Sequence, residues 1–332
     1  MFERIFDPAA MLVLAGFTVA GFMIGAIIGA VKRESGAAPF VRGAEAAVLA
    51  FLGGLIARAF ISILLGTAKD SPGAGLAVGW GFFLIPGIVD TIPFFFDTRI
   101  LTKPEVLLML ATIVGAFSAM MNGVWRIYDW RGLGWLSFPL DVTWALAGNT
   151  IGCLVHLINF TWGKHGEEIR LNAHRYKRGF RIKGDDTGAP DTDENQQRGY
   201  AFTQGAVMSN LADKPGDDLY RHEKTHVWQG RSFGPMFTLT YIGWMAAWAI
   251  PGLIAGAIVK AGIFQGAEKW CYFNSPWETW AYAVQKLDRA DLADTSEQKR
   301  LIWRAIFVIL WAIPFFGLAT FLAILTVVSI WG

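Results

Sequence analysis

Residues 9–31 read AAMLVLAGFTVAGFMIGAIIGAV and contain no charged side chain. A helix of this length extends for about 34 Å, which is enough to cross the hydrocarbon core of a bilayer, roughly 30 Å thick. The stretch is too long to be a removed signal peptide, and it lacks the flank of a cleavage site. It therefore predicts a membrane-spanning helix that stays in the protein.

The whole chain shares this apolar character. Of its 332 residues, 54% are hydrophobic and only 17% are charged, and 15 Trp, 25 Phe and 37 Gly are present. This composition is typical of proteins with lipid-facing surfaces and closely packed helices. It predicts an α-helical polytopic membrane protein with the lipid bilayer as a partner, and it excludes collagens, disordered tails and disulfide-rich scaffolds. The net charge of +2 gives no reason to expect nucleic-acid binding. The two cysteines, Cys153 and Cys271, predict neither a disulfide framework nor a cysteine zinc site.

Five apolar segments precede the first polar region, so residues 1–162 are expected to form a five-span transmembrane region. The expected spans are residues 9–31, 44–66, 73–96, 105–124 and 133–162. A C-terminal transmembrane helix is expected in residues 301–332. In the first span, Gly21, Gly25 and Gly29 recur every four residues and predict a helix face that a partner helix approaches closely.

Several polar residues lie inside these spans, where an ionisable group is costly and normally faces protein or water. Arg58 and Asp90 could therefore pair with each other. Asp141, Asn149 and His156 follow one another at spacings of eight and seven residues, which places them on one helix face. They predict an internal polar seam between helices, and an auxiliary catalytic function is the alternative.

Residues 163–232 differ in kind, because charges crowd in and the hydrophobic runs shorten to strand length. We expect two short strands, Phe180–Ile182 and Tyr200–Ser209, on either side of a loop at 184–197. The segment after Asp218, LYRHEKTHVWQGR, has helical spacing and no breaker before Gly230. The chain is thus predicted to carry a small α+β insert.

Lys and Arg near span ends indicate which membrane face is cytoplasmic. If the N-terminus is outside, twelve of these residues lie on the side of the insert and four on the other side, so the insert is expected in the cytoplasm. The twelve are Lys32, Arg33, Arg42, Arg99, Lys103, Lys164, Arg170, Arg175, Lys177, Arg178, Arg181 and Lys183; the four are Arg4, Lys69, Arg126 and Arg131. The expected location is a bacterial inner (plasma) membrane.

His222-Glu223-Lys224-Thr225-His226 is an H-E-x-x-H sequence within the predicted helix. Two histidines four residues apart lie one turn apart on one face, where both imidazoles can hold a single Zn²⁺. Glu223 lies beside them and could act as the general base for a water that the zinc activates. Random placement of this composition gives only roughly 0.003 matches to the pattern, so coincidence explains it poorly.

A catalytic zinc site normally has a third protein ligand, and Glu278 in NSPWETWAY is the best candidate. Ser275 can cap the following helix and Pro276 suits its first position, so Glu278 projects from the first turn. A competing interpretation is a capping box, in which Glu278 bonds the Ser275 amide. Weaker substitutes as the third ligand are Glu268, Asp288 and Asp291. Tyr282 shares a helix face with Glu278 and could donate a hydrogen bond to a developing oxyanion, and plain packing is its alternative.

The sequences RHEKTHVWQ and NSPWETWAY resemble the gluzincin class of zinc metallopeptidases, which pair an H-E-x-x-H helix with a glutamate from a later helix. The resemblance implies that His222, His226 and Glu278 are zinc ligands and that Glu223 is the general base. It also implies that GYAFTQGAVMSN is an edge strand that pairs with an extended substrate. The resemblance identifies no subgroup, because Tyr282 stands where the CAAX-processing and heat-shock proteases usually carry an acidic residue.

The three ligands must reach one ion, which constrains residues 233–264. A single crossing there would carry Glu278 to the opposite side of the membrane, and 32 residues are too few for two comfortable spans. We therefore expect a re-entrant or interfacial pair of short helices that turns near Pro251, within a zincin-like region covering residues 163–300.

Together these features predict a membrane-embedded zinc-dependent endopeptidase acting on a peptide or membrane-protein substrate near the cytoplasmic face. Two alternatives remain at this stage. One is a zinc-dependent amidase acting on a lipid or cell-wall precursor, and the other is a non-enzymatic scaffold or transporter with a structural metal site. The sequence gives no indication of oligomeric state.

Overall fold

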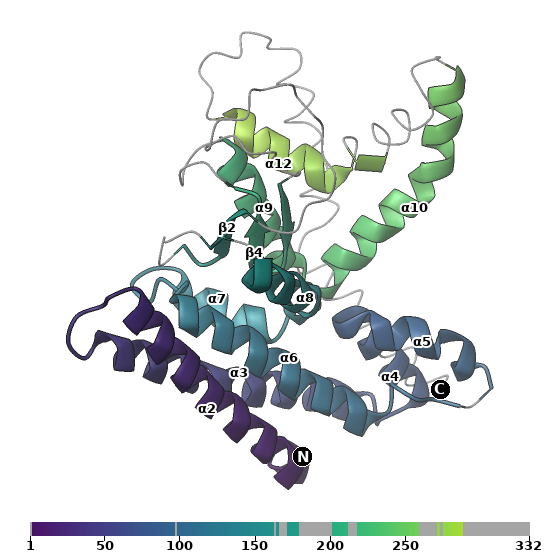
Figure 1. The fold of residues 1–332 in the computed structure, drawn as a ribbon. Helices are drawn as coiled ribbons and strands as arrows, with labels where there is room; N and C mark the ends of the chain where they lie inside the picture. Colours follow the sequence, from purple (N-terminus) through teal and green to yellow (C-terminus); the bar gives the residue numbers. More distant parts are fainter. Residues whose placement is uncertain are drawn as a thin grey trace.

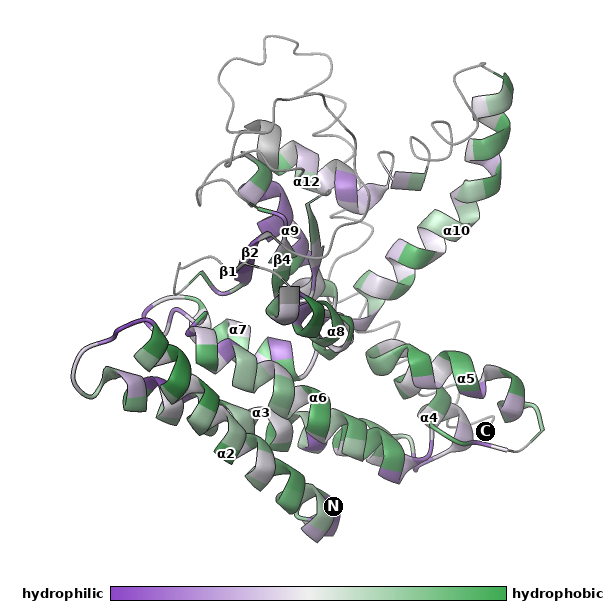
Figure 2. Ribbon diagram, viewed as in Figure 1, coloured by the Kyte–Doolittle hydropathy of each residue, from purple (hydrophilic) through white to green (hydrophobic). Residues whose placement is uncertain are grey.

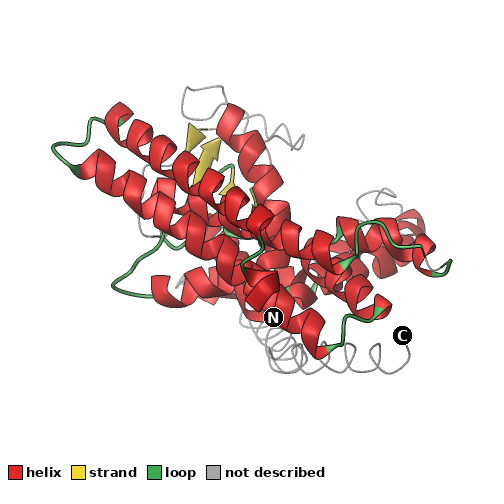
Figure 3. Cartoon of the chain, turned by 90° about the horizontal axis from the view of Figure 1, so that it is seen from below, coloured by secondary structure: helices red, strands yellow, loops and turns green. Residues whose placement is uncertain are grey.

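A computed structural model describes residues 2–96, 98–162, 164–165, 171–178, 201–211, 218–258, 271–272 and 275–287. The predicted strand Phe180–Ile182, the loop at 184–197 and the C-terminal span at 301–332 lie outside these residues. Helices dominate the described part, and the few short strands form one small group (Figure 3). The prediction of a mainly helical protein with a small sheet is therefore confirmed.

Three long helices pack side by side as one layer (Figure 1): α2 (Pro8–Val31), α3 (Ala38–Thr67) and α6 (Pro104–Trp125). A four-residue helix, α1 (Phe2–Ile5), precedes them. Their residues are largely hydrophobic (Figure 2), as expected for helices in contact with lipid. Together with α10 (Pro235–Ile258), they are the four helices of the described residues that are long and apolar enough to cross a membrane.

The glycine stripe of the first span serves helix packing, as predicted. Gly21, Gly25 and Gly29 are all buried against α3. A Cβ atom on Gly25 would lie 2.9 Å from the Cα atom of Gly43 and 3.0 Å from the carbonyl oxygen of Arg42. Because these are backbone atoms, a side chain at Gly25 would force the two helices apart.

Residues 73–96 do not form the single span that we predicted. They form α4 (Pro72–Val78), a π-helical turn (η1, Gly79–Phe83) and α5 (Ile85–Phe94). The chain is broken at Leu84, which has a left-handed φ of +60°. Asp90 of α5 accepts hydrogen bonds from the amides of Ile100 and Thr102, just before α6 begins, and Gly75 of α4 lies against Thr102. The segment from α4 to α5 thus begins and ends at the same end of the helical layer, where α3 ends and α6 begins.

This return makes α6 run in the same direction as α2, and their C-terminal ends lie together. Arg42, near the start of α3, donates a 2.7 Å hydrogen bond to the carbonyl of Val124 near the end of α6, and Glu45 of α3 pairs with Arg126 at 2.9 Å. Our assignment of Arg126 and Arg131 to the face opposite Lys32, Arg33 and Arg42 is therefore wrong, and Arg99 and Lys103 move to the other end. The insert lies at the end that carries Arg126, because His165 stacks on Trp125 with ring centroids 3.9 Å apart.

Arg58 and Asp90 do not pair. The Arg58 guanidinium binds the carboxylate of Asp7 at 3.2 Å and the carbonyl of Arg4, whereas Asp90 is satisfied by backbone amides and by Thr102. Arg58 and Asp90 thus each stabilise a turn at the same end of the helical layer instead of linking two spans.

The fifth predicted span is two helices, α7 (Gly134–Val142) and α8 (Leu146–Trp162), which are bent by 89° at the break between them. The polar seam crosses this bend, because the Asn149 side chain donates a 2.6 Å hydrogen bond to the carbonyl of Asp141. His156, further along α8, bonds the hydroxyl of Tyr176 in the insert at 3.2 Å. The predicted internal seam is therefore present, although its residues do not share one straight helix.

The insert is built on four short strands in the order β1-β2-β4-β3. Their bounds are β1 (Lys164–His165), β2 (His174–Arg178), β3 (Phe202–Gln204) and β4 (Val207–Ser209). β2 pairs in parallel with β4, and the other two pairings are antiparallel. Within the predicted strand Tyr200–Ser209, residues 202–209 form a hairpin, because Gly205 has a φ of +58° and turns the chain.

Helix α9 (Asp218–Phe233) covers this sheet, and α12 (Pro276–Leu287) packs on α9. Buried Tyr220 and Val227 of α9 share a hydrophobic core with Met208 and Leu211, while Phe233 packs against Trp277 of α12. Gly234, with a φ of +53°, ends α9, and α10 begins at Pro235.

The expected pair of short helices in residues 233–264 is not observed. α10 runs unbroken from Pro235 to Ile258, through Pro251, and rises away from the other helices in Figure 1. A proline removes one helical hydrogen bond, and such a loss is tolerated in apolar helices. Hydropathy and one proline were therefore insufficient to locate a break.

We predict that Gly25→Val destabilises the protein, because the added side chain would press on the backbone of α3. Overpacking of this kind costs about 1–3 kcal/mol. Gly16→Val is the control, since Gly16 lies on the same helix and has no atom within 4 Å of its Cβ position. Thermal unfolding in detergent should show a lower Tm for Gly25→Val only, and equal shifts for both variants would contradict the packing of α2 on α3.

Candidate metal centre

Helix α9 presents His222 and His226 on one face, one turn apart. Both side chains are buried, with 3% and 7% of their surface exposed. Their Nε2 atoms point at each other across 3.2 Å. The predicted helix therefore places the two imidazoles as the H-E-x-x-H spacing requires.

Glu278 reaches the two histidines from the first turn of α12. One carboxylate oxygen, Oε2, lies 3.2 Å from Nε2 of His222, and Oε1 lies 3.4 Å from Nε2 of His226. Glu278 is itself 2% exposed. The structure thus brings together the three side chains predicted to be metal ligands.

The capping-box interpretation of Glu278 does not hold. The Ser275 amide donates instead to the carbonyl of Tyr272 at 2.9 Å. The Ser275 hydroxyl is buried and has no hydrogen-bond partner within the described residues. The carboxylate of Glu278 is therefore directed at the histidines and is not used to cap its own helix. Of the weaker substitutes, Glu268, Asp288 and Asp291 all lie outside the described residues.

The ligand atoms lie close enough together for one metal ion. Two ligands held about 2.0–2.1 Å from one ion at a tetrahedral angle are about 3.3 Å apart. The Nε2 atoms of the two histidines are 3.2 Å apart, and they lie 3.2 and 3.4 Å from different oxygens of the Glu278 carboxylate. The group could therefore hold one metal ion, and it is the sole cluster of this kind among the described residues.

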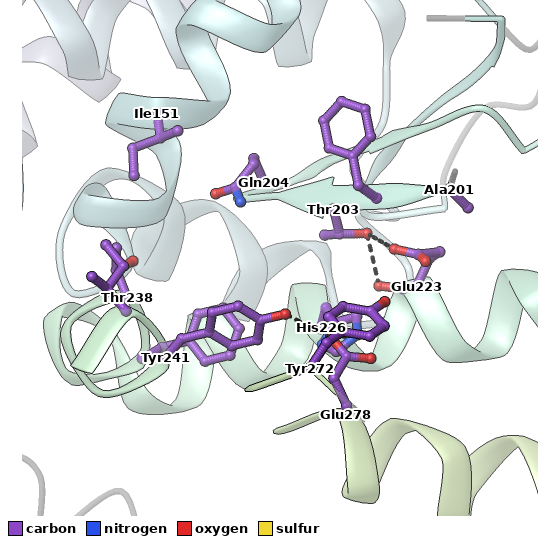
Figure 4. Close-up of a pocket in the computed structure, with 13 residues that line it drawn as sticks. Ile151, Ala201, Thr203, Gln204, Glu223, His226, Thr238, Tyr241, Tyr272 and Glu278 are labelled. Atoms are coloured by element: carbon purple, nitrogen blue, oxygen red, sulfur yellow. Dashed lines mark hydrogen bonds and ion pairs between the residues drawn. The ribbon is translucent and has the colours of Figure 1, made fainter. Parts of the chain in front are cut away.

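Glu223 lies beside the ligands and is held by strand β3. The Thr203 hydroxyl donates a 2.6 Å hydrogen bond to Oε2 of Glu223 and also lies 3.2 Å from its carbonyl oxygen (Figure 4). Glu223 is 3% exposed and lines the cleft that the site faces. A carboxylate fixed in this way can accept a proton from a molecule bound in the cleft.

Two further residues orient the ligands, and the sequence analysis did not identify them. The Oε1 atom of Gln229 accepts a 2.8 Å hydrogen bond from Nδ1 of His226, and its amide nitrogen donates to the carbonyl of Trp277 at 3.0 Å. The Tyr241 hydroxyl of α10 donates to Oε1 of Glu278 at 2.9 Å. Gln229 could have been found from its position three residues after His226, whereas no local pattern connects Tyr241 with Glu278.

Tyr282 contacts the site from α12, and its ring lies against His222 with centroids 4.5 Å apart. The phenols that line the cleft are those of Tyr241 and Tyr272. This ring contact supports the alternative that Tyr282 packs against the site. An oxyanion-stabilising function for Tyr282 remains a prediction.

The cleft beside the ligands has a volume of about 640 Å³, counting the space at its open mouth. Polar residues of β3 and α9 form one wall, and Ile151 of α8 with Phe237 and Ile242 of α10 form another. The metal ligands thus lie where the insert meets two apolar helices.

The hairpin that carries β3 is fixed to α8 by close backbone contacts. A Cβ atom on Gly152 would lie 2.8 Å from the carbonyl of Gln204, and one on Gly205 would lie 2.8 Å from the carbonyl of Gly148. The Asn149 side chain adds a 3.2 Å hydrogen bond from the Ala206 amide. Residues of the predicted seam therefore position the strand beside the cleft.

Helix α9 is fixed to α7 by a buried ion pair. Arg231 binds both carboxylate oxygens of Asp141 at 2.8 Å and the carbonyl of Asn172 at 2.6 Å. Both charged side chains are 2% exposed, and the Tyr128 hydroxyl donates a 3.0 Å hydrogen bond to the same carboxylate. Asp141 thus holds the helix that carries the metal ligands.

Burial and mutual contact alter the ionisation of the ligands in the metal-free site. Burial opposes the charged form of His226, but hydrogen bonding and the charge of Glu278 outweigh it and raise the pKa of His226 to about 9. Burial likewise opposes the Glu278 carboxylate, and its hydrogen bonds to His222 and His226 lower its pKa well below the usual value. A proton on His226 therefore compensates the carboxylate when no metal is bound.

The remaining three histidines lie together near the end of α6. His165 and His174 are in hydrogen-bond contact at 3.1 Å, and Nε2 of His174 bonds the Asn122 side chain at 2.7 Å. His156 packs beside His174. None of the three belongs to the metal-ligand cluster.

Comparison of the chain with protein-family models, curated proteins and solved structures finds no match.

We predict that Glu278→Ala weakens zinc binding by more than about 100-fold, because it removes one of three ligands. Ser275→Ala is the matched control, since it alters the neighbouring capping position and leaves the carboxylate in place. Zinc titration against a chromophoric chelator measures both. Unchanged affinity in Glu278→Ala would exclude it as a ligand.

Metal binding should also strengthen as pH rises. His226 must lose its proton before Nε2 can bind a metal, and its pKa of about 9 keeps it protonated at neutral pH. The Kd for zinc should therefore fall about tenfold per pH unit from pH 7 towards 9 and level off above that. Calorimetry in buffers of different ionisation enthalpy should detect the released proton. A Kd that is constant over this range would contradict the protonated state of His226.

Proposed function

We propose that this protein is a membrane-embedded zinc-dependent endopeptidase that hydrolyses a peptide bond close to the cytoplasmic membrane face. The observation that carries the proposal is the buried group of His222, His226 and Glu278, whose ligand atoms lie close enough to hold one ion, with Glu223 beside it on the cleft wall. This set of three ligands and a neighbouring carboxylate is the arrangement of gluzincin metallopeptidases, which the sequence resembles.

The ligand set favours zinc. Two imidazole nitrogens and one carboxylate oxygen are typical of catalytic zinc sites, which keep a fourth position open for water or substrate. When bound, zinc would polarise the scissile carbonyl and lower the pKa of water. His222, His226 and Glu278 would hold the ion, while Gln229 and Tyr241 would keep two of these ligands in position.

Glu223 would act as the general base. Its carboxylate faces the cleft within reach of the ligands, and the Thr203 hydroxyl fixes its orientation without occupying both oxygens. Glu223 would take a proton from the attacking water and then transfer it to the amine that leaves, so that the proton balance closes within one residue.

The strand beside the cleft favours a peptide over another amide. β3 lies at the edge of the sheet in the described residues, and Thr203 and Gln204 line the cleft. An edge strand can hold an extended peptide through backbone hydrogen bonds, and no such support is needed for a small lipid or cell-wall amide. A purely structural metal site would not require a carboxylate facing an open cleft.

Glu223→Gln is the test of this proposal. It should lower hydrolysis of fluorescein-labelled casein by at least about 100-fold while zinc remains near one ion per chain, because the base is lost and the ligands are kept. Glu105→Gln is the control, since Glu105 is exposed at the start of α6, outside the cleft. Casein hydrolysis and metal analysis are measured on the same preparations. A wild-type protein that binds no zinc, or a Glu223→Gln variant as active as Glu105→Gln, would exclude the proposal.

A further inference from the structure

We infer that the substrate carries an apolar segment on one side of the scissile bond, and that this segment enters the cleft from the bilayer, between α8 and α10. The inference rests on the proposed function, because it names the class of peptide that the same site accepts. It follows from the difference between the two walls of the cleft and from what lies beyond its mouth.

The two walls of the cleft offer a substrate different groups. On the insert side, Thr203, Gln204 and Glu223 offer polar groups to a peptide backbone, and Ala201 and Phe202 lie beside them. On the far side, Ile151 comes from α8 (Figure 4) and Phe237 and Ile242 come from α10, where Thr238 and Tyr241 lie next to them. A bound chain would therefore have its backbone near β3 and its side chains against hydrocarbon on the other side.

The apolar wall continues outward as exposed apolar surface. Ile242 lines the cleft and is also 46% exposed, and Met245, almost one turn further along α10, is 38% exposed. On α8, Leu154 lies one turn beyond Ile151 and is 52% exposed. Contiguous apolar surface of this kind is stable in lipid and unfavourable in water. The mouth between the two helices therefore opens towards the membrane.

The charge of the cleft favours the same class of substrate. Apart from the metal ligands, the charged side chain in its described lining is Glu223, and no lysine or arginine is present there. An acidic flank would find no lysine or arginine to pair with beyond the metal site, whereas an apolar flank would be matched by Ile151, Phe237 and Ile242. The lining thus favours a hydrophobic residue next to the scissile bond over an acidic one.

Two probes that share a zinc-binding leucyl-leucine hydroxamate test the inference, one unmodified and one bearing a 16-carbon acyl chain. Their binding to zinc-loaded protein in lipid nanodiscs is measured by competition with a fluorescent hydroxamate. Ile242→Glu places a charge at the mouth. Ile254→Glu is the matched control, because Ile254 is an exposed isoleucine of the same helix and lies outside the cleft lining.

Ile242→Glu should weaken binding of the acylated probe by about tenfold more than it weakens binding of the unmodified probe. Ile254→Glu should bind both probes like the wild type. Partition of the acyl chain into lipid is the same for both variants. A difference in their affinity for the acylated probe therefore reports contact of the acyl chain with the mouth of the cleft. Equal affinities of the two variants for the acylated probe would overturn the inference. Wild-type protein that holds zinc but binds neither probe would instead remove the peptidase proposal, and the inference with it.

Discussion

A carboxylate buried between two imidazoles needs a positive charge, and the arrangement of the insert depends on this requirement. Glu278 is almost fully enclosed, and its oxygens face the nitrogens of His222 and His226. Removing such a carboxylate from water is costly unless a cation is near. In the metal-free protein a proton on His226 supplies that charge, and a metal ion at the same point would replace it. The contact between α9 and α12 therefore depends on whether a proton or a metal ion lies between Glu278 and the two histidines.

This coupling is effective because α9 is held rigidly at its other end. The ion pair between Arg231 and Asp141 is buried on both sides, so loss of either partner would leave an isolated charge in the interior, which typically costs about 3–5 kcal/mol. Phe233 then fixes the end of α9 against Trp277. The helix that carries the histidines is thus attached to the membrane part at one end and to the Glu278 helix along its side.

The sequence predicted the elements whose signals are local. Residues 9–31 are uniformly apolar and form α2, and the spacing within H-E-x-x-H placed His222 and His226 on one helix face. The expectation of a third ligand led to Glu278, and the structure brings its carboxylate to both histidines. The prediction of a single span at residues 73–96 was wrong, because hydropathy reports how apolar a segment is and not whether it crosses the membrane. The segment turns back because Asp90 binds the backbone just before α6. Tyr241 could not be found, since its contact with Glu278 joins residues 37 positions apart.

The contact of the Gly205 hairpin with α8 has a mechanical consequence. Because Gly148 and Gly152 leave no side chains between the two backbones, the hairpin and the helix have no freedom to slide past each other. Tilting of α8 would carry the hairpin with it and change the gap between Thr203 and the H-E-x-x-H helix. The orientation of the Glu223 carboxylate, which Thr203 holds, is in this way linked to the position of α8.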